Sequence, residues 1–189
     1  MVEGVQIMMS LDKAWSLLQT ADMICSEEEV SRALRRLAGE ISLDLGSRYP
    51  LVISVMGGAV YFAGQLLPLL HFPLDLDYIH ATRYGDATAG GDLTWRVEPR
   101  ENVRDRDVLV IDDILDGGHT LAAIRERILG MGAASFQCAV LTEKDTGVAK
   151  PIRAEYVGLN LPNRYVFGCG MDCSGAWRNL PAIYAVKGM

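Results

Sequence analysis

The sequence has no long apolar segment and no basic segment at its start. Its longest uncharged, mostly apolar run extends from Ala59 to Leu70, about 12 residues, whereas a membrane-spanning helix needs roughly 20. No membrane partner is therefore expected. The first ten residues include Glu3 and neither Lys nor Arg, so they lack the basic region that opens a secretory signal. We expect a cytoplasmic protein.

Basic charge, cysteine and histidine are also scarce. The formal net charge is -6, which argues against broad binding to nucleic acid, because that affinity comes largely from Lys and Arg neutralising phosphates; a local basic patch remains open. The four cysteines are Cys25, Cys138, Cys169 and Cys173, and we expect free thiols, since a chain of this size does not need disulfides. None of the three histidines lies near the last two cysteines, so a structural zinc site is not expected.

The chain does contain enough apolar residues for a substantial core: half of its 189 residues are hydrophobic. Ser10 precedes a helical apolar spacing over 11–21, and Ser26 with Glu29 has the form of a capping box before a second helix over 30–45. Strands are then predicted at 51–55, 74–81, 108–111 and 136–141, with helices at 59–70 and 119–130. This alternation predicts an α/β domain with a mainly parallel central sheet flanked by helices, whose ligands bind beyond the carboxyl ends of the strands.

Two segments depart from this alternation. Residues 82–106 are polar, rich in glycine and charge, and interrupted by Leu93–Val97, which predicts a mobile two-stranded flap. After about residue 150, short strands and turns punctuated by prolines predict a small hood. We therefore expect one domain over 1–189, with N-terminal helices in 1–48, a core in 49–145 that includes the flap, and a C-terminal hood in 146–189.

The most informative segment extends from Val108 to Leu121, where a buried strand ends in two acids and a glycine-rich loop leads into a helix. Glycines let backbone N–H groups turn toward a phosphate, and the helix N-terminus favours negative charge there. Asp112 and Asp113 would repel a phosphate, but carboxylates are good acceptors for vicinal ribose hydroxyls. A plainer interpretation, helix-capping acids and an ordinary turn, does not explain this concentration of charge beside a buried strand. The Walker spacing is absent.

This segment resembles the phosphoribosyl-pyrophosphate binding signature of the type I phosphoribosyltransferases, and residues 50–187 resemble the hypoxanthine-guanine phosphoribosyltransferases. The resemblance implies a Mg²⁺-dependent transfer of ribose 5-phosphate from phosphoribosyl pyrophosphate to a 6-oxopurine, giving IMP or GMP. It implies that Asp112 and Asp113 hold the ribose hydroxyls and that Asp116 is the general base. The 5-phosphate would be bound by Asp116, Gly117, Gly118, His119 and Thr120.

A second match is Met56-Gly57-Gly58, which resembles the family's pyrophosphate loop. Many relatives have Lys where Met56 stands, so a direct charge contact is missing here, and these glycines could instead only turn the chain into the next helix. The family often has a non-proline cis peptide at this point. Arg178 matches a pyrophosphate-binding arginine, a role that suits its planar fork.

The third match covers the predicted hood. By resemblance, Lys144 donates to the 6-oxo group, Tyr165 stacks on the base, the Val166 backbone pairs with the base edge, and Asp172 lies on the side of the base 2-position. Adenine should be a poor substrate, because its amino group would face another donor.

The resemblance also implies partners and a metal. Mg²⁺ would be held by Asp112, Asp113 and Asp172, and the flap would begin at Arg83 and Tyr84, where Arg83 stands in place of the usual Ser. Relatives form dimers and tetramers, so we expect a homo-oligomer. Two alternatives stay open from the sequence: a regulator that keeps the fold to sense nucleotides, and a transferase that prefers xanthine or a pyrimidine.

Overall fold

The computed structural model describes residues 9–83, 93–100 and 103–188. Within those residues, no helix combines the length and apolar character needed to cross a membrane. In chain order, the elements are α1 (Leu11–Thr20), β1 (Asp22–Cys25), α2 (Glu27–Leu45), β2 (Leu51–Val55), α3 (Val60–Leu66), the 3-10 turn η1 (Leu67–Leu69), β3 (Asp75–Arg83), β4 (Leu93–Val97), β5 (Asp107–Leu115), α4 (His119–Gly130), β6 (Ser135–Lys144), β7 (Tyr156–Leu161), β8 (Val166–Phe167) and β9 (Ile183–Ala185).

A six-stranded sheet forms the centre of the molecule, in the order β4-β3-β2-β5-β6-β7. Every neighbouring pair from β3 to β7 is parallel, and β4 is an antiparallel edge strand. The predicted α/β fold with a mainly parallel sheet is therefore confirmed. Such a sheet is covered on both faces, which is why β2 is buried along its whole length.

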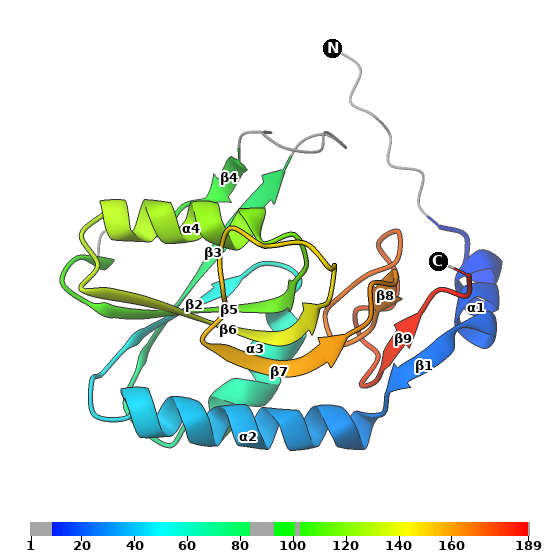
Figure 1. The fold of residues 1–189 in the computed structure, drawn as a ribbon, viewed down its shortest axis with the longest axis horizontal. Helices are drawn as coiled ribbons and strands as arrows, with labels where there is room; N and C mark the ends of the chain where they lie inside the picture. The colour runs from blue at the N-terminus through cyan, green and yellow to red at the C-terminus, as the bar shows by residue number, and fades with distance from the viewer. Residues whose placement is uncertain (1–8, 84–92, 101–102, 189) are drawn as a thin grey trace, which may run out of the picture.

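Helices α2 and α3 cover one face of this sheet and α4 covers the other (Figure 1). Helix α2 begins at the predicted capping box, in which the Ser26 side chain accepts from the Glu29 N–H and the Glu29 carboxylate accepts from the Ser26 N–H. The predicted helix over 59–70 is shorter in the structure. The α-helix α3 ends at Leu66 and the 3-10 turn η1 follows it, because Pro68 has no N–H to extend the α-helical hydrogen bonding.

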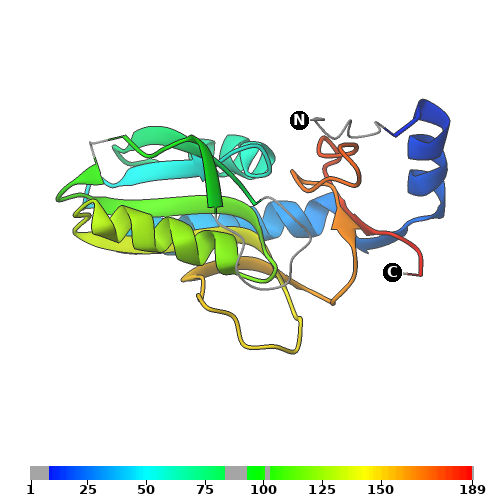
Figure 2. The same ribbon diagram turned by 90° about the horizontal axis from the view of Figure 1, so that it is seen from above.

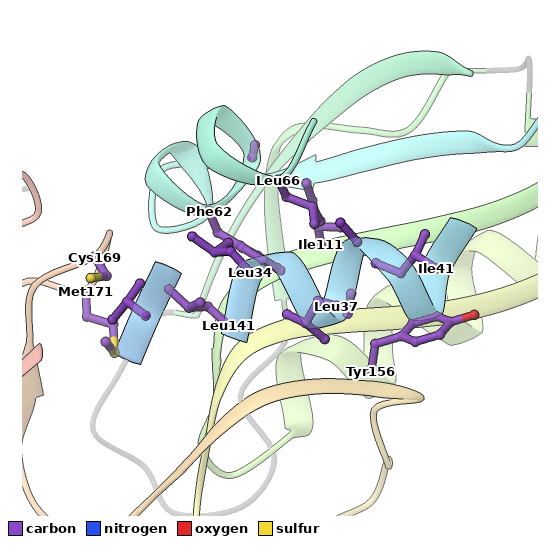
Figure 3. Close-up of a cluster of buried hydrophobic side chains, with 14 of the residues drawn as sticks. Leu34, Leu37, Ile41, Phe62, Leu66, Ile111, Leu141, Tyr156, Cys169 and Met171 are labelled. Carbon is purple, nitrogen blue, oxygen red and sulfur yellow. The ribbon is translucent and has the colours of Figure 1, made fainter. Parts of the chain in front are cut away.

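The larger part of the core lies between α2, α3 and the sheet (Figure 3). Leu37 and Ile41 of α2 and Phe62 of α3 are completely buried there, packed with Ile111 of β5 and Leu141 of β6. A second cluster joins α4 to the opposite face. Alternate residues of β5 therefore enter the two clusters, which holds this strand rigidly in the sheet.

A second, three-stranded sheet in the order β1-β9-β8 lies at one end of the molecule (Figures 1 and 2). Strand β1 was not predicted, because its partner β9 lies about 160 residues away in sequence, as the pair Asp22↔Ala185 shows. This small sheet combines β1, from the predicted N-terminal segment, with β8 and β9 from the predicted hood. Strand β7, which also lies in the predicted hood segment, joins the central sheet. The division at residues 48 and 145 stays a prediction.

The expected flap is described only at its base. Strands β3 and β4 pair antiparallel up to Arg83↔Leu93, and residues 84–92, including Tyr84, lie outside the described residues. Closure of a flap therefore stays a prediction. The four cysteines are buried free thiols, as expected from the sequence.

Candidate functional site

The candidate site lies where the direction of strand order reverses. From β2 the chain crosses through α3 to β3 on one side, and from β5 it crosses through α4 to β6 on the other. The carboxyl ends of β2 and β5, which are adjacent in the sheet, therefore border a crevice between two diverging connections. A cavity of about 520 Å³ opens at that point.

This cavity brings together most of the residues that the sequence predicted. Its lining includes the predicted residues Met56, Gly57, Gly58, Asp112, Asp113, Asp116, Gly117, Gly118, His119, Thr120 and Arg178. The residues predicted to bind the purine do not line it: Lys144, Tyr165, Val166 and Asp172. Lys144 and Asp172 do contact residues that line it.

Asp112 and Asp113 lie within β5 and not after it. The predicted strand end at residue 111 is wrong, because the ladder with β6 continues to Leu115↔Glu143. Both acids are buried, and the Asp113 N–H donates to Asp112 Oδ1 at 2.9 Å. Burial and the neighbouring Asp113 charge raise the pKa of Asp112 well above its ordinary value, and burial also raises the pKa of Asp113. The pair therefore resists carrying two charges until a cation or hydroxyl donors arrive.

The glycine turn between β5 and α4 presents the start of a helix to the cavity. Gly118 is the N-cap residue of α4 with φ +78°, a conformation that suits glycine, and it has no side chain to cap the helix. The first N–H groups of α4 are thus available to an anion. A Cβ at Gly118 would lie 3.3 Å from the Leu115 and Ile152 side chains, so the turn is tightly packed from behind.

The loop after β2 lies directly against Asp113. A Cβ at Gly58 would collide with the Asp113 carboxylate, and one at Gly170 would collide with the Gly58 carbonyl. The Met56–Gly57 peptide is cis. Because Met56 carries no charge, this loop can offer only backbone groups to an anion.

Arg178 supplies the positive charge on this side of the cavity. Its Nη1 donates to the Gly170 carbonyl at 2.6 Å, and its Nη2 pairs with Asp172 Oδ1. The other Asp172 oxygen accepts from the Gly175 N–H at 2.6 Å. The 170–178 turn thus holds a guanidinium that lines the cavity.

Lys144 and Asp116 form an ion pair across the ends of β6 and β5. Lys144 Nζ lies 2.6 Å from Asp116 Oδ2, with the lysine side chain 11% exposed and the aspartate side chain 50% exposed. An ammonium has three N–H donors, so Lys144 can keep this contact and still donate to a ligand. The predicted base donor and general base are therefore neighbours.

Tyr165 and Val166 lie at the small sheet. Tyr165 is 46% exposed, which leaves its ring accessible, and burial of the rest raises the pKa of its hydroxyl. Val166 is buried in β8 and pairs with Ala185 of β9.

Two residues of this region were missed from the sequence. His80 of β3 lines the cavity, although a lone histidine on a strand gave no signal beyond packing. Lys150, in the β6–β7 loop, contacts the backbones of both Leu115 and Lys144. Only the fold brings these residues to the site.

Comparison with known proteins agrees with this geometry. Residues 20–173 match the family model described as "Phosphoribosyl transferase domain". The chain is 31% identical to the hypoxanthine-guanine phosphoribosyltransferase of Bacillus subtilis, over 87% of this chain and 92% of that one. It is 35% identical to the bifunctional protein TilS/HprT of Listeria monocytogenes, of which it spans 26%.

A crystal structure gives the same result at the level of the fold. The hypoxanthine phosphoribosyltransferase of Staphylococcus aureus superposes with a TM-score of 0.85 at 25% identity, over 91% of this chain and 95% of that one. The family match covers most of the chain and includes β2, β5 and the loops that follow them. The chain belongs to the phosphoribosyltransferase family.

Proposed function

We propose that this chain is a purine salvage enzyme, which transfers the 5-phosphoribosyl group of phosphoribosyl pyrophosphate to hypoxanthine or guanine and releases IMP or GMP and pyrophosphate. The observation that carries the proposal is the cavity at the β2–β5 crevice, where a buried acid pair, a glycine turn and Arg178 meet. The relatives named above support the choice of purine, and neither the nucleotide-sensing regulator nor the xanthine-preferring transferase is favoured by them.

The ribose 5-phosphate would occupy the β5 side of the cavity. Asp112 and Asp113 would accept the vicinal hydroxyls, because hydrogen bonds from hydroxyl donors stabilise buried carboxylates. The turn from Asp116 to Thr120 would surround the phosphate with N–H groups from the start of α4, with Thr120 adding a hydroxyl donor.

The leaving pyrophosphate would occupy the β2 side. Gly57 and Gly58 would allow close approach of the backbone, and Arg178 would pair with two phosphate oxygens through its fork. The bond from the anomeric carbon to the pyrophosphate oxygen breaks while a bond from that carbon to the purine nitrogen forms, and the purine proton passes to Asp116. A carboxylate at this position also stabilises positive charge on the ribose.

The base would lie between Lys144 and Tyr165. Lys144 would donate to the 6-oxo group while it remains beside Asp116, and the exposed Tyr165 ring would stack on the base. The Val166 backbone would pair with the base edge, and Asp172 would lie near the 2-position. A cationic donor facing position 6 selects oxopurines against adenine.

The acid pair also suits Mg²⁺. The described residues contain no group of three acidic, histidine or cysteine side chains that could enclose a metal, and Mg²⁺ commonly uses one or two carboxylates together with substrate phosphates. Asp112 and Asp113, whose mutual repulsion a cation would relieve, would hold it, with Asp172 nearby. When bound, Mg²⁺ neutralises the charge of the leaving group.

The remaining parts of the proposal concern the flap, assembly and location. A flap that begins at Arg83 and Tyr84 would exclude water from the reacting carbon. Homo-oligomerisation, as dimer or tetramer, is supported by the apolar side chains of Val60, Leu76 and Tyr78, each more than 40% exposed. A cytoplasmic location is supported by the four free thiols.

The test is to incubate pure protein with phosphoribosyl pyrophosphate, Mg²⁺ and each of hypoxanthine, guanine, xanthine and adenine, and to separate the nucleotides formed. IMP and GMP are expected, with little AMP. No nucleotide from any base would refute the proposal and favour the regulator. Preference for adenine would refute the role of Lys144, and preference for xanthine would refute the substrate choice.

A further inference from the structure

Lys150 is a nearly buried cation outside the set of predicted site residues. Its side chain is 10% exposed, although it belongs to the loop between β6 and β7, which projects from the sheet (Figure 2). Lysine is rarely buried unless its charge is paired. The surroundings of its ammonium group therefore indicate what this residue does.

The Lys150 ammonium has three acceptors, one for each of its N–H groups. It lies 2.7 Å from the Lys144 carbonyl, 3.0 Å from the Leu115 carbonyl and 3.0 Å from Glu143 Oε1. Leu115 directly precedes Asp116, and Leu115 and Glu143 form the last paired residues of β5 and β6. One side chain thus joins the two strands where their ladder ends.

Beyond this point the backbone ladder between β5 and β6 has ended, so side-chain contacts join the two strands there. Strand β5 turns into the glycine loop, while β6 continues to pair with β7 as far as Lys144↔Leu161. The Lys150 stem also supports the glycine loop, because a Cβ at Gly118 would lie 3.4 Å from the Lys150 Cβ. The contact therefore acts on the residues that present Asp116 and Lys144.

We propose that Lys150 is a positioning residue, which fixes the separation of the Asp116 and Lys144 backbones. A bound 6-oxopurine can then contact the general base Asp116 and the Lys144 ammonium, which donates to its 6-oxo group, at the same time. This role rests on the proposed function. It requires no contact between Lys150 and the substrate, and Lys150 does not line the β2–β5 cavity. Reaction rates are sensitive to displacements of about 1 Å. Loss of the ammonium contacts alone leaves the lysine stem behind the glycine loop, so it should raise KM for the purine more than KM for phosphoribosyl pyrophosphate.

The kinetic test compares Lys150→Met, which keeps the length of the side chain and removes the ammonium, with Lys187→Met at an exposed lysine. For Lys150→Met we expect kcat/KM for hypoxanthine to fall by about 10- to 100-fold, with a raised KM for the base, and KM for the donor to stay within about twofold. Lys187→Met should match the wild type. A fall in kcat alone, in proportion to the loss of folded protein, would overturn the proposal, as would unchanged kinetics.

Two further measurements keep the outcome decisive. If Lys150→Met does not fold, Glu143→Gln removes the charge of one acceptor; its KM for the base should rise about two- to fivefold, and an unchanged KM would overturn the proposal. Amide hydrogen exchange over residues 114–118 and 143–146 should be faster in the ligand-free Lys150→Met variant than in Lys187→Met. Equal exchange would overturn the role of Lys150, whereas an inactive wild type would refute the proposed function and leave the exchange comparison valid.

Discussion

The two loops that border the cavity present polar groups in different ways. The end of β5 and the loop that follows it supply three acids, a glycine turn and a helix N-terminus from nine consecutive positions, 112–120. The loop after β2 offers only backbone, and its cation comes from Arg178, more than a hundred residues later. The sugar side of the proposed site is thus encoded locally, whereas the pyrophosphate side depends on the hood being in place.

The largest expected effect tests the β5 side. Asp116→Asn should lower kcat by about 10²- to 10⁴-fold, the range for loss of a general base. The free energy of unfolding should fall by only about 1–2 kcal/mol, because the nearly buried Lys144 loses its counter-charge but keeps an oxygen acceptor. Initial rates and denaturant unfolding would measure the two quantities. Asp12→Asn, at an exposed position of α1, is the control. Activity within a few-fold of wild type would exclude Asp116 as the base.

The next effect tests whether the β2 loop depends on its fit to Asp113. Gly58→Ala places a methyl group on the Asp113 carboxylate, so we expect a loss of about 1–3 kcal/mol of stability from overpacking and a fall in activity of at least about tenfold. Gly64→Ala in α3, where a Cβ meets nothing within 4 Å, should be neutral or stabilising. Thermal unfolding and initial rates measure the effects; equal behaviour of the two variants would contradict the contact.

A smaller effect concerns pH. The folded-state pKa values of Asp112 and Asp113 are raised by burial, so the protonated pair favours the folded state. The contribution of this pair to stability should be greatest below the ordinary aspartate pKa and fall as pH rises from about 4 through the raised values, by up to about 1.4 kcal/mol per pH unit for each proton lost. Urea unfolding at a series of pH values measures this. Asp112→Asn should flatten the profile; an unchanged slope would contradict the assignment.

The smallest effect is expected from a substitution that gives the loop after β2 a charged side chain of its own. Met56→Lys adds a cation beside the proposed pyrophosphate, and because the site is open to solvent we expect KM for the donor to fall by only about two- to fivefold. Steady-state kinetics at varied donor concentration measure it, with Met56→Leu as a neutral control. A raised donor KM for Met56→Lys alone would indicate that the uncharged side chain is itself required.

Local patterns predicted the parts of the molecule that depend on neighbouring residues. Helix α4 matches its predicted bounds, and the Ser26 capping box starts α2. The end of β5 was misplaced because charged residues normally mark a strand end, whereas here Asp112 and Asp113 stay in the ladder with β6.

Contacts between segments far apart in the chain could not be predicted from the sequence. The resemblance assigned Lys144 and Asp116 separate roles, but their ion pair depends on the pairing of β5 with β6. Lys150 gave no signal, since a lysine in a polar loop is usually solvated. Its burial depends on contacts with the ends of β5 and β6, which only the folded sheet brings together.

The pairing of β1 with β9 has a consequence for biosynthesis. Residues 22–25 leave the ribosome long before residues 183–185 exist, so β1 has no partner during most of translation. All six strands of the central sheet are synthesised before β9, since the last of them, β7, ends at Leu161. The surface that carries Tyr165 must therefore assemble last, and a chain released early would retain the ribose side of the pocket without a platform for the base.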